Sequence, residues 1–253
     1  MARKPLFQYT HIEAGLVENV VLRPTDDTET YPSGWKYTLH LGTLDDLTLV
    51  RYDNSHEDTK GHEHHTAAGD LDDVEFPGME DRLVEFWASA DEYWDAVGGD
   101  PPRPHGSNTT RHTLTMTTLH ITVDDREQLR GDALQFVQDV EADNLDDQDG
   151  TATLQFGTYD DFVDSLTPLR LELIRAIAEE VPESMREAAR LVERDVSDVH
   201  SDLKQLEVLG ILTLEEGGPS GAIQPVVPFD RIEVRIDYPL IDSGDADGTP
   251  ASA

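Results

Sequence analysis

The strongest constraint on the fold is a break in periodicity near the middle of the chain. Residues 97–112, VGGDPPRPHGSNTTRH, are dominated by Gly, Pro, Ser and Asn, and neither helical nor strand periodicity continues through them. The 253 residues are enough for two ordinary domains. We therefore expect a domain at residues 1–97, a linker at 98–112, a second domain at 113–240 and a disordered polar tail at 241–253.

The first domain has the pattern of an antiparallel sheet with a helix packed against it. The segments WKYTLHLG and DLTLVRYD alternate apolar and polar residues, which predicts a strand hairpin that turns at TLDD. The later segment FPGMEDRLVEFWASADEYWDAV predicts a helix that follows Pro77 and Gly78 and buries one apolar side. The first domain is therefore expected to be an α+β unit.

The second domain begins with alternating strand and helix patterns. TLTMTTLHITV and TATLQFGT predict strands, and the helix between them is expected to begin at a cap formed by Asp124 or Asp125. YDDFVDSL and TPLRLELIRAIAEE then predict two helices. Ser184, followed three residues later by Glu187, is a capping-box pattern that predicts the start of another helix.

The end of this domain has the pattern of a winged helix-turn-helix. Val196, Val199, Leu203 and Leu206 recur at 3-4-3 spacing, which predicts a buried stripe on a helix that ends at Gly210. ILTLEE and RIEVRIDY then predict the two strands of a β-ribbon. The predicted fold class is thus an antiparallel-sheet-plus-helix domain followed by a winged helix-turn-helix domain.

The last helix of this pattern is the one that would enter a DNA groove. Small polar residues lie opposite its buried stripe, and arginines on and after the preceding helix are placed to reach phosphates. The predicted DNA contacts are Arg186, Arg190, Arg194, Ser197, His200, Ser201 and Lys204. The alternative is a helical interaction module whose basic residues are ordinary surface.

The charge of the chain is strongly negative, at −34, with 53 acidic and 19 basic residues. Such a charge normally argues against nucleic acid as a partner. The acid here is dispersed through every segment, which indicates a halophilic protein adapted to molar salt, where the Debye length falls to about 3 Å. We therefore read the charge as a sign of habitat and keep operator DNA and an RNA substrate as predicted partners.

The composition also bears on location. No apolar run approaches the roughly 18 residues that a membrane span needs. The first residues, MARKPLFQYTHIEAG, show no apolar signal region. We expect a cytoplasmic protein with no membrane partner. Cysteine is absent, which excludes disulfides and cysteinyl metal sites.

Titratable side chains concentrate in residues 51–65, RYDNSHEDTKGHEHH. Three explanations compete: a metal site built from the histidines, an acid–base catalytic site, and a solvated acidic loop. Neighbouring residues of an extended loop point different ways, and no HExxH helical spacing occurs, so a metal site is the weaker functional explanation.

Metal-independent cleavage of RNA fits the residue types of this segment better. A 2′-hydroxyl that attacks its own phosphodiester needs a base, an acid and a cation. Histidine serves as base or acid near neutrality, and arginine binds phosphate in a bidentate way. The catalytic candidates are Arg51, Asp53, Asn54, His56, Lys60, His62, His64 and His65. No metal or cofactor is predicted, and whether the site is an active endoribonuclease is left open.

Both parts of the chain resemble known families. TMTTLHITVDDREQLRGDALQFVQDVE and RDVSDVHSDLKQLEVLGIL, within about residues 116–238, resemble haloarchaeal winged-helix regulators of the TumA type, which are proposed antitoxins. WKYTLHLG, LVRYDNSHEDTKGHEHHT and DVEFPGMEDRLVEFW, within about residues 10–97, resemble the small TumE-type toxin.

The two resemblances together imply a toxin–antitoxin fusion. The C-terminal domain would restrain the N-terminal toxin, within one chain or in a homodimer, and would bind operator DNA to repress its own operon. The alternative is a winged-helix transcriptional regulator whose N-terminal domain is a non-catalytic sensor or oligomerisation unit.

Overall fold

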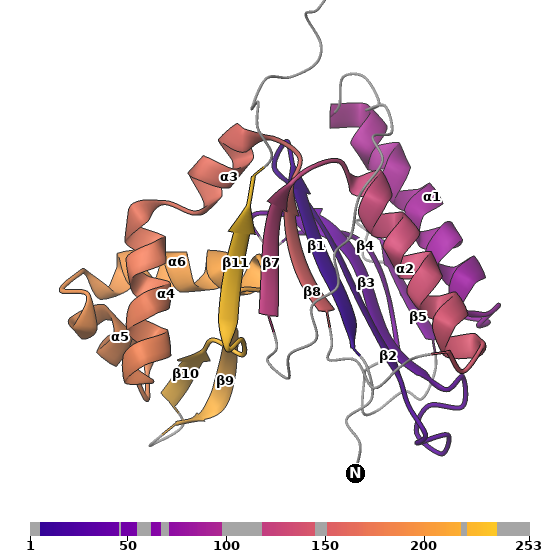
Figure 1. Cartoon of the computed structure of the whole chain (residues 1–253). Helices are drawn as coiled ribbons and strands as arrows, with labels where there is room; N and C mark the ends of the chain where they lie inside the picture. The colour runs from indigo at the N-terminus through magenta and orange to yellow at the C-terminus, as the bar shows by residue number, and fades with distance from the viewer. Residues whose placement is uncertain are drawn as a thin grey trace, which may run out of the picture.

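The computed structural model describes residues 6–45, 47–54, 62–66, 71–97, 118–144, 151–218 and 222–236. Within these ranges the chain is a mixed α+β structure, with one large sheet, a separate two-stranded hairpin and helices on both sides of the large sheet (Figure 1). The predicted linker and the predicted tail lie outside the described residues.

The large sheet has nine described strands in the order β11-β7-β8-β1-β2-β3-β4-β5-β6. Its antiparallel part is made of β1 (Phe7–Glu13), β2 (Leu16–Pro24), β3 (Trp35–Thr43), β4 (Thr48–Asp53), β5 (His62–Thr66) and β6 (Leu71–Val74). Its parallel part adds β7 (Thr118–Val123), β8 (Thr151–Phe156) and β11 (Arg231–Arg235). The predicted hairpin is confirmed as β3 and β4.

The sheet runs from the N-terminal part of the chain into the C-terminal part without a break. Strand β1 pairs in parallel with β8, from Phe7 opposite Thr151 to Ile12 opposite Phe156. Residues from both predicted domains therefore share one hydrogen-bonded ladder. The predicted domain boundary at residues 98–112 remains a prediction that the segments on either side of it can fold independently.

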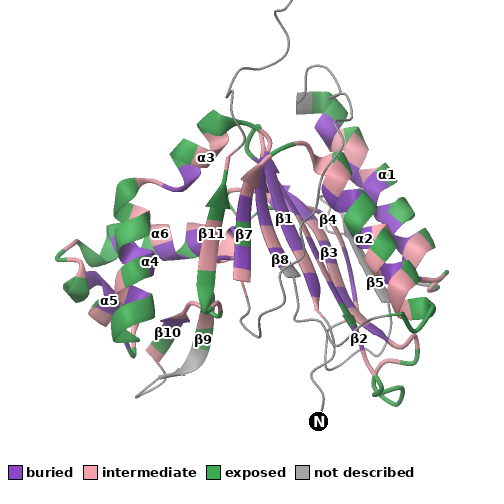
Figure 2. Cartoon of the chain, in the orientation of Figure 1, coloured by how far each residue is buried: buried purple, intermediate pink, exposed green. Residues whose placement is uncertain are grey.

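One face of the sheet is covered by α1 (Met79–Val97) and α2 (Arg126–Glu141) (Figure 1). The side chains between them and strands β1–β4 form the first hydrophobic core, to which α1 contributes Leu83 and Phe86 and α2 contributes Ala133. Both helices turn buried residues toward the sheet and exposed residues outward (Figure 2). Of the two predicted caps, Asp124 and Asp125, it is Asp125 that caps α2, because its side chain accepts a hydrogen bond from the Glu127 amide.

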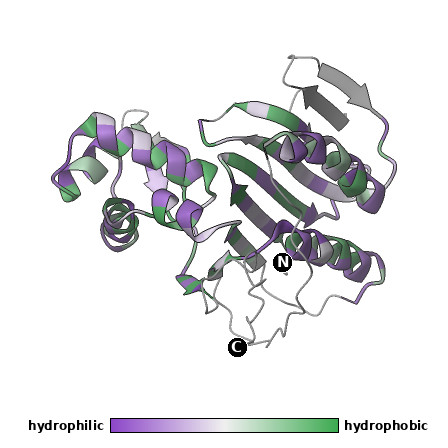
Figure 3. Cartoon of the chain, turned by 90° about the horizontal axis from the view of Figure 1, so that it is seen from above, coloured by the Kyte–Doolittle hydropathy of each residue, from purple (hydrophilic) through white to green (hydrophobic). Residues whose placement is uncertain are grey.

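The other face of the sheet packs against a second group of elements, most of them helical. This group contains α3 (Tyr159–Ser165), α4 (Pro168–Glu180), α5 (Met185–Leu191), α6 (Val196–Val208), β9 (Thr213–Gly218) and β10 (Ala222–Val226). Its apolar side chains form a second core with residues of β1, β7 and β8, among them Ile12, Ile121 and Leu154. Seen from above, the sheet lies between this group and the α1–α2 pair (Figure 3).

The capping predictions for this group are confirmed. Ser184 caps α5 by accepting from the Glu187 amide at 3.2 Å. Gly210 follows α6 with φ +71°, the left-handed conformation that ends a helix. A β-carbon at Gly210 would lie 3.2 Å from Gln8 Nε2 and 3.3 Å from Thr10 Oγ1, so the end of α6 contacts strand β1 closely.

Two details differ from the sequence-based prediction. Val199, Leu203 and Leu206 of α6 are buried, but Val196, in the first turn of this helix, is 44% exposed. The predicted ribbon of ILTLEE with RIEVRIDY is wrong. Strand β9 pairs with β10, which lies inside the Gly/Pro-rich excursion, and β11 joins β7 at the edge of the large sheet.

Candidate functional site

The predicted catalytic segment begins at the end of β4, where three of its residues have described side chains. Arg51 Nε lies 2.5 Å from Asp53 Oδ2, and the Asp53 side chain is fully buried. Asn54 accepts from the Tyr37 amide at 3.0 Å and donates to the Trp35 carbonyl at 2.7 Å. Asp53 is thus placed to neutralise the charge of Arg51. The Asn54 side chain links the end of β4 to the backbone of β3.

The predicted histidines are described only in part. His62, His64 and His65 lie in β5, whose backbone is described, and His56 and Lys60 lie outside the described residues. The register places His65 opposite Arg51 and His64 opposite Tyr52. Tyr52 packs into the first core, and successive residues of a strand belong to opposite faces, so His64 falls in the row of Tyr52 and His65 in the row of Arg51.

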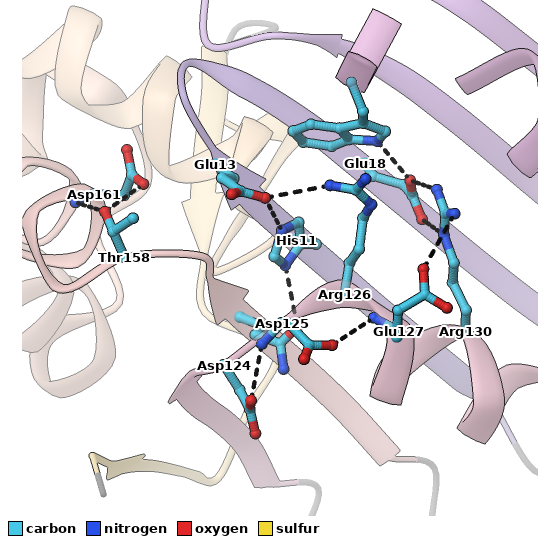
Figure 4. A network of polar contacts seen from close by, with 12 residues as sticks. His11, Glu13, Glu18, Asp124, Asp125, Arg126, Glu127, Arg130, Thr158 and Asp161 are labelled. Atoms are coloured by element: carbon cyan, nitrogen blue, oxygen red, sulfur yellow. Dashed lines mark hydrogen bonds and ion pairs between the residues drawn. The ribbon is translucent and has the colours of Figure 1, made fainter. Parts of the chain in front are cut away.

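A second polar cluster, which the sequence did not single out, lies beneath α1 and α2 (Figure 4). At its centre is Glu18 of β2, which is fully buried. Its carboxylate accepts from the Tyr9 hydroxyl at 2.6 Å and from Trp94 Nε1 at 3.0 Å. It also accepts from Arg130 Nε at 3.2 Å and Arg130 Nη2 at 2.7 Å, a bidentate pair between β2 and α2.

His11 and Glu13 extend this cluster along β1. The His11 ring is fully buried, with Nδ1 3.0 Å from Gln155 Oε1 of β8 and Nε2 3.4 Å from Glu13 Oε2. Arg126 Nη1 donates to the same Glu13 oxygen at 3.3 Å. His11 and Glu18 are register partners on neighbouring strands, so an imidazole and a carboxylate lie side by side.

The two arginines of α2 also lie over tryptophan rings of α1. The Arg126 guanidinium is 4.8 Å from the ring centroid of Trp94, and that of Arg130 is 5.5 Å from the ring centroid of Trp87. Arg126 and Arg130 are four residues apart, so both lie on one face of the helix. Each guanidinium is therefore held between an indole ring and a carboxylate.

The electrostatics of this cluster favour the charged forms of Glu13, Glu18 and Arg130. Burial alone raises the pKa of Glu18, but the Arg130 guanidinium and the Tyr9 hydroxyl bring the pKa below its ordinary value. The hydrogen bond from His11 lowers the pKa of Glu13, against an opposing effect of burial and with help from Arg126. Burial alone lowers the pKa of Arg130, but Glu18 raises it above its ordinary value.

The sequence did contain a signal for this second cluster. Glu18 stands in LVENVVL at the alternate position that Leu16, Val20 and Leu22 also occupy, and these three residues are buried. Arg130 precedes buried Ala133 by three residues, so it falls on the buried stripe of α2. A carboxylate and a guanidinium on two buried faces predict a buried ion pair, although not which groups meet.

The predicted DNA contacts are spread over an exposed surface and a groove. Arg186, Arg190, Ser197 and His200 are exposed. Ser201 and Lys204 are exposed too, but they also line a groove of about 400 Å³ with Leu44 and Asp45 of the β3–β4 turn and with Gln205, Glu207 and Val208 of α6. That turn therefore borders part of the α6 surface that we predicted to contact DNA.

Arg194 differs from the other basic residues of this region. Its Nη2 donates to Asp202 Oδ2 at 2.6 Å, while Arg170 Nε donates to the other Asp202 oxygen at 2.9 Å. The shared carboxylate joins the start of α4 and the turn before α6 to α6 itself. In this structure the Arg194 guanidinium is thus bound to Asp202 of the same chain. Lys204 is also paired, with Glu207 at 2.9 Å, but half of its side chain is exposed.

Two classes of feature are absent from the part of the chain that the structure describes. There, no three or more His, Asp or Glu side chains are grouped in a way that would hold a metal ion. The helices of the described ranges also lack the combination of length and apolarity that crossing a membrane requires.

Comparison with known families matches two separate segments of the chain. Residues 2–93, which contain β1 to β6 and most of α1, match the family described as Toxin TumE. Residues 165–234, which contain α4 to α6, β9 and β10, match the family described as HVO_A0114. No curated protein and no solved structure matches the chain. The first match supports a toxin-like N-terminal unit, and α2 lies outside both matches.

Proposed function

We propose that the chain is a toxin–antitoxin fusion in which a toxin-like N-terminal unit is held inactive by the C-terminal part of the same chain. The observation that carries this proposal is the buried pair between Glu18 of the toxin-like unit and Arg130 of the C-terminal part. The parallel pairing of β1 with β8 supports it, because it joins the same two parts through the backbone. In this proposal the restraint acts in cis.

The proposed activity of the N-terminal unit is metal-independent cleavage of RNA. A family match to a toxin and a segment rich in His, Arg and carboxylates support it. The predicted segment supplies Arg51 as a phosphate-binding cation and His65 in the same row of the sheet as a proton carrier. The Arg51–Asp53 contact orients the guanidinium.

The proposed role of the C-terminal part is operator binding by a winged helix. The order α4, α5, α6 and the β9–β10 hairpin supports this assignment, with α6 as the groove-reading helix and the hairpin as the wing. Arg190, Ser197 and His200 are exposed, so these side chains could contact DNA without a rearrangement of the protein. Binding of its own operator would couple the amount of the protein to its own synthesis.

The test of the fusion is separate expression of its parts in a halophilic host. Residues 1–97, residues 113–253, both together, and the full chain are induced, and growth is followed with immunoblots to confirm equal expression. We expect arrest by residues 1–97, relief when residues 113–253 are supplied, and no arrest by the full chain. Absence of arrest with the fragment present would instead favour a winged-helix regulator with a non-catalytic N-terminal unit.

The test of operator binding is a gel-shift titration of the full chain on the DNA upstream of its own gene, over a range of KCl concentrations. We expect Arg190→Ala to weaken binding to all sequences and to reduce the slope of log affinity against log salt by about 1. Arg175→Ala, which removes an exposed arginine of α4, is the matched control. Equal effects of the two substitutions would exclude α5 from the DNA interface.

A further inference from the structure

The cluster of His11, Glu13 and Glu18, here called the acid–imidazole cluster, has the composition of a reactive site. It combines a fully buried carboxylate with a fully buried imidazole on neighbouring strands, and a second carboxylate against that imidazole. All three residues belong to the segment that matches the toxin family. The cluster is on the face that α1 covers, opposite to the face of Arg51 and Asp53.

The groups that close this cluster come from outside the matched segment. Arg126 and Arg130 of α2 bind Glu13 and Glu18, and Gln155 of β8 contacts His11. Within the toxin-like unit itself, Glu18 keeps only its contacts with the Tyr9 hydroxyl and Trp94. Removing α2 would therefore uncover two carboxylates, an imidazole and the faces of two indole rings.

We propose that Glu18 and His11 are the base and the acid of the toxin-like unit and that α2 is the element that inhibits it, by occupying the acid–imidazole cluster with Arg126 and Arg130. This inference rests on the proposed cleavage of RNA. It replaces Arg51 and His65 by Glu18 and His11 as the reacting groups, and within the C-terminal part it assigns the restraint to α2.

Burial decides between inhibition and an alternative in which the arginines complete the site by binding phosphate. With α2 packed over the cluster, which we call the closed state, the Arg130 side chain is 8% exposed. Its Nε and Nη2 groups both donate hydrogen bonds to Glu18. A phosphodiester has no access to such a guanidinium, and a carboxylate bound by it is a poor base. The arrangement therefore fits a closed state.

In the open state the reaction is transfer of an RNA phosphodiester to its own 2′-oxygen. Glu18 accepts the proton of the 2′-hydroxyl, the 2′-oxygen forms a bond to phosphorus, and the bond from phosphorus to the 5′-oxygen breaks. His11, as the imidazolium, is both the cation beside the phosphate and the acid that donates a proton to the leaving 5′-oxygen. The products are a 2′,3′-cyclic phosphate and a 5′-hydroxyl end, and one proton is taken up for each one released.

The test uses the full chain, purified in molar KCl and incubated with a mixed-sequence RNA oligonucleotide. The Arg126→Ala/Arg130→Ala variant loses the polar contacts that hold α2 over Glu13 and Glu18, so we expect it to populate the open state and to cleave the RNA, while the unchanged chain does not. Adding His11→Gln to that variant is expected to lower the cleavage rate by about 100-fold, the usual contribution of one general acid or base. Glu18→Gln is expected to do the same.

Two controls keep the outcome interpretable. Arg175→Ala/Arg231→Ala removes two exposed arginines elsewhere and is expected to leave the chain inactive. Circular dichroism reports whether the α2 variant is folded. If it is not, Arg126→Lys/Arg130→Lys keeps the charges but loses the bidentate geometry, and a smaller gain of cleavage is expected.

Failure of this inference differs from failure of the proposed function. If residues 1–97 arrest growth but the folded α2 variants cleave no RNA, the fusion stands and α2 is not its inhibitor. If the α2 variants cleave RNA equally well with His11→Gln and Glu18→Gln, α2 inhibits but the acid–imidazole cluster is not the site. Cleavage that depends on both groups supports the whole inference.

Discussion

The Arg130→Ala substitution is the sharpest test of how the two parts of the chain are held together. It removes both hydrogen bonds to Glu18, the hydrogen bond to Asp91 at 2.8 Å and the contact with the Trp87 ring. While α2 remains packed on the sheet, Glu18 then keeps only two neutral donors, the Tyr9 hydroxyl and Trp94 Nε1. Removing one partner of a buried ion pair costs about 3–5 kcal/mol, which is a large part of the roughly 5–15 kcal/mol that stabilises a typical domain.

The measurement is urea unfolding in molar KCl, followed by tryptophan fluorescence. Trp87 and Trp94 both contact the pair, so their emission reports on the region that changes. A double-mutant cycle with Glu18→Gln isolates the pairwise interaction, and we expect a coupling energy of about 2–3 kcal/mol. The control Arg175→Ala, at an exposed position, should change the free energy of unfolding by less than about 0.5 kcal/mol.

A small effect would refute the reasoning. If Arg130→Ala costs less than about 1 kcal/mol, the pair behaves like an exposed one, and it does not anchor α2 to β2. A coupling energy near zero would show that Glu18 and Arg130 do not contact each other in solution. Either result would also remove the observation on which restraint in cis depends.

Three further predictions concern stability. Gly210→Ala is expected to cost at least about 1–2 kcal/mol in urea unfolding, because φ is +71° and the new β-carbon lies 3.2 Å from Gln8 Nε2. Asn54→Ala should cost about 1–3 kcal/mol by the same assay, since it leaves a backbone amide and a carbonyl of β3 without their partner. Glu13 and Glu18 have lowered pKa values in the folded chain, so their contribution is complete above their unfolded pKa of about 4.3 and is lost as the pH falls through the folded values. A pH series that shows no loss of stability on acidification would contradict the described contacts of these carboxylates.

The sequence by itself determined the local elements. Alternation in WKYTLHLG predicted β3, the Asp125 and Ser184 caps predicted where α2 and α5 begin, and the stripe of α6 was correct from Val199 onward. These features depend on residues within one or two turns or on one strand, so periodicity and capping are sufficient to predict them. The resemblance of the N-terminal part to the toxin family also rested on local motifs.

The tertiary structure decided how these elements pair and which charges meet. Glu18 and Arg130 are 112 positions apart, and neither sequence neighbourhood indicates the other. The parallel pairing of β1 with β8 and the transfer of β11 to the large sheet follow from the same kind of distant contact. Periodicity shows which face of an element is buried, but not against what it is buried. The partner of a buried charge is set by the packing of whole elements, because only there does the cost of desolvation select one opposite charge.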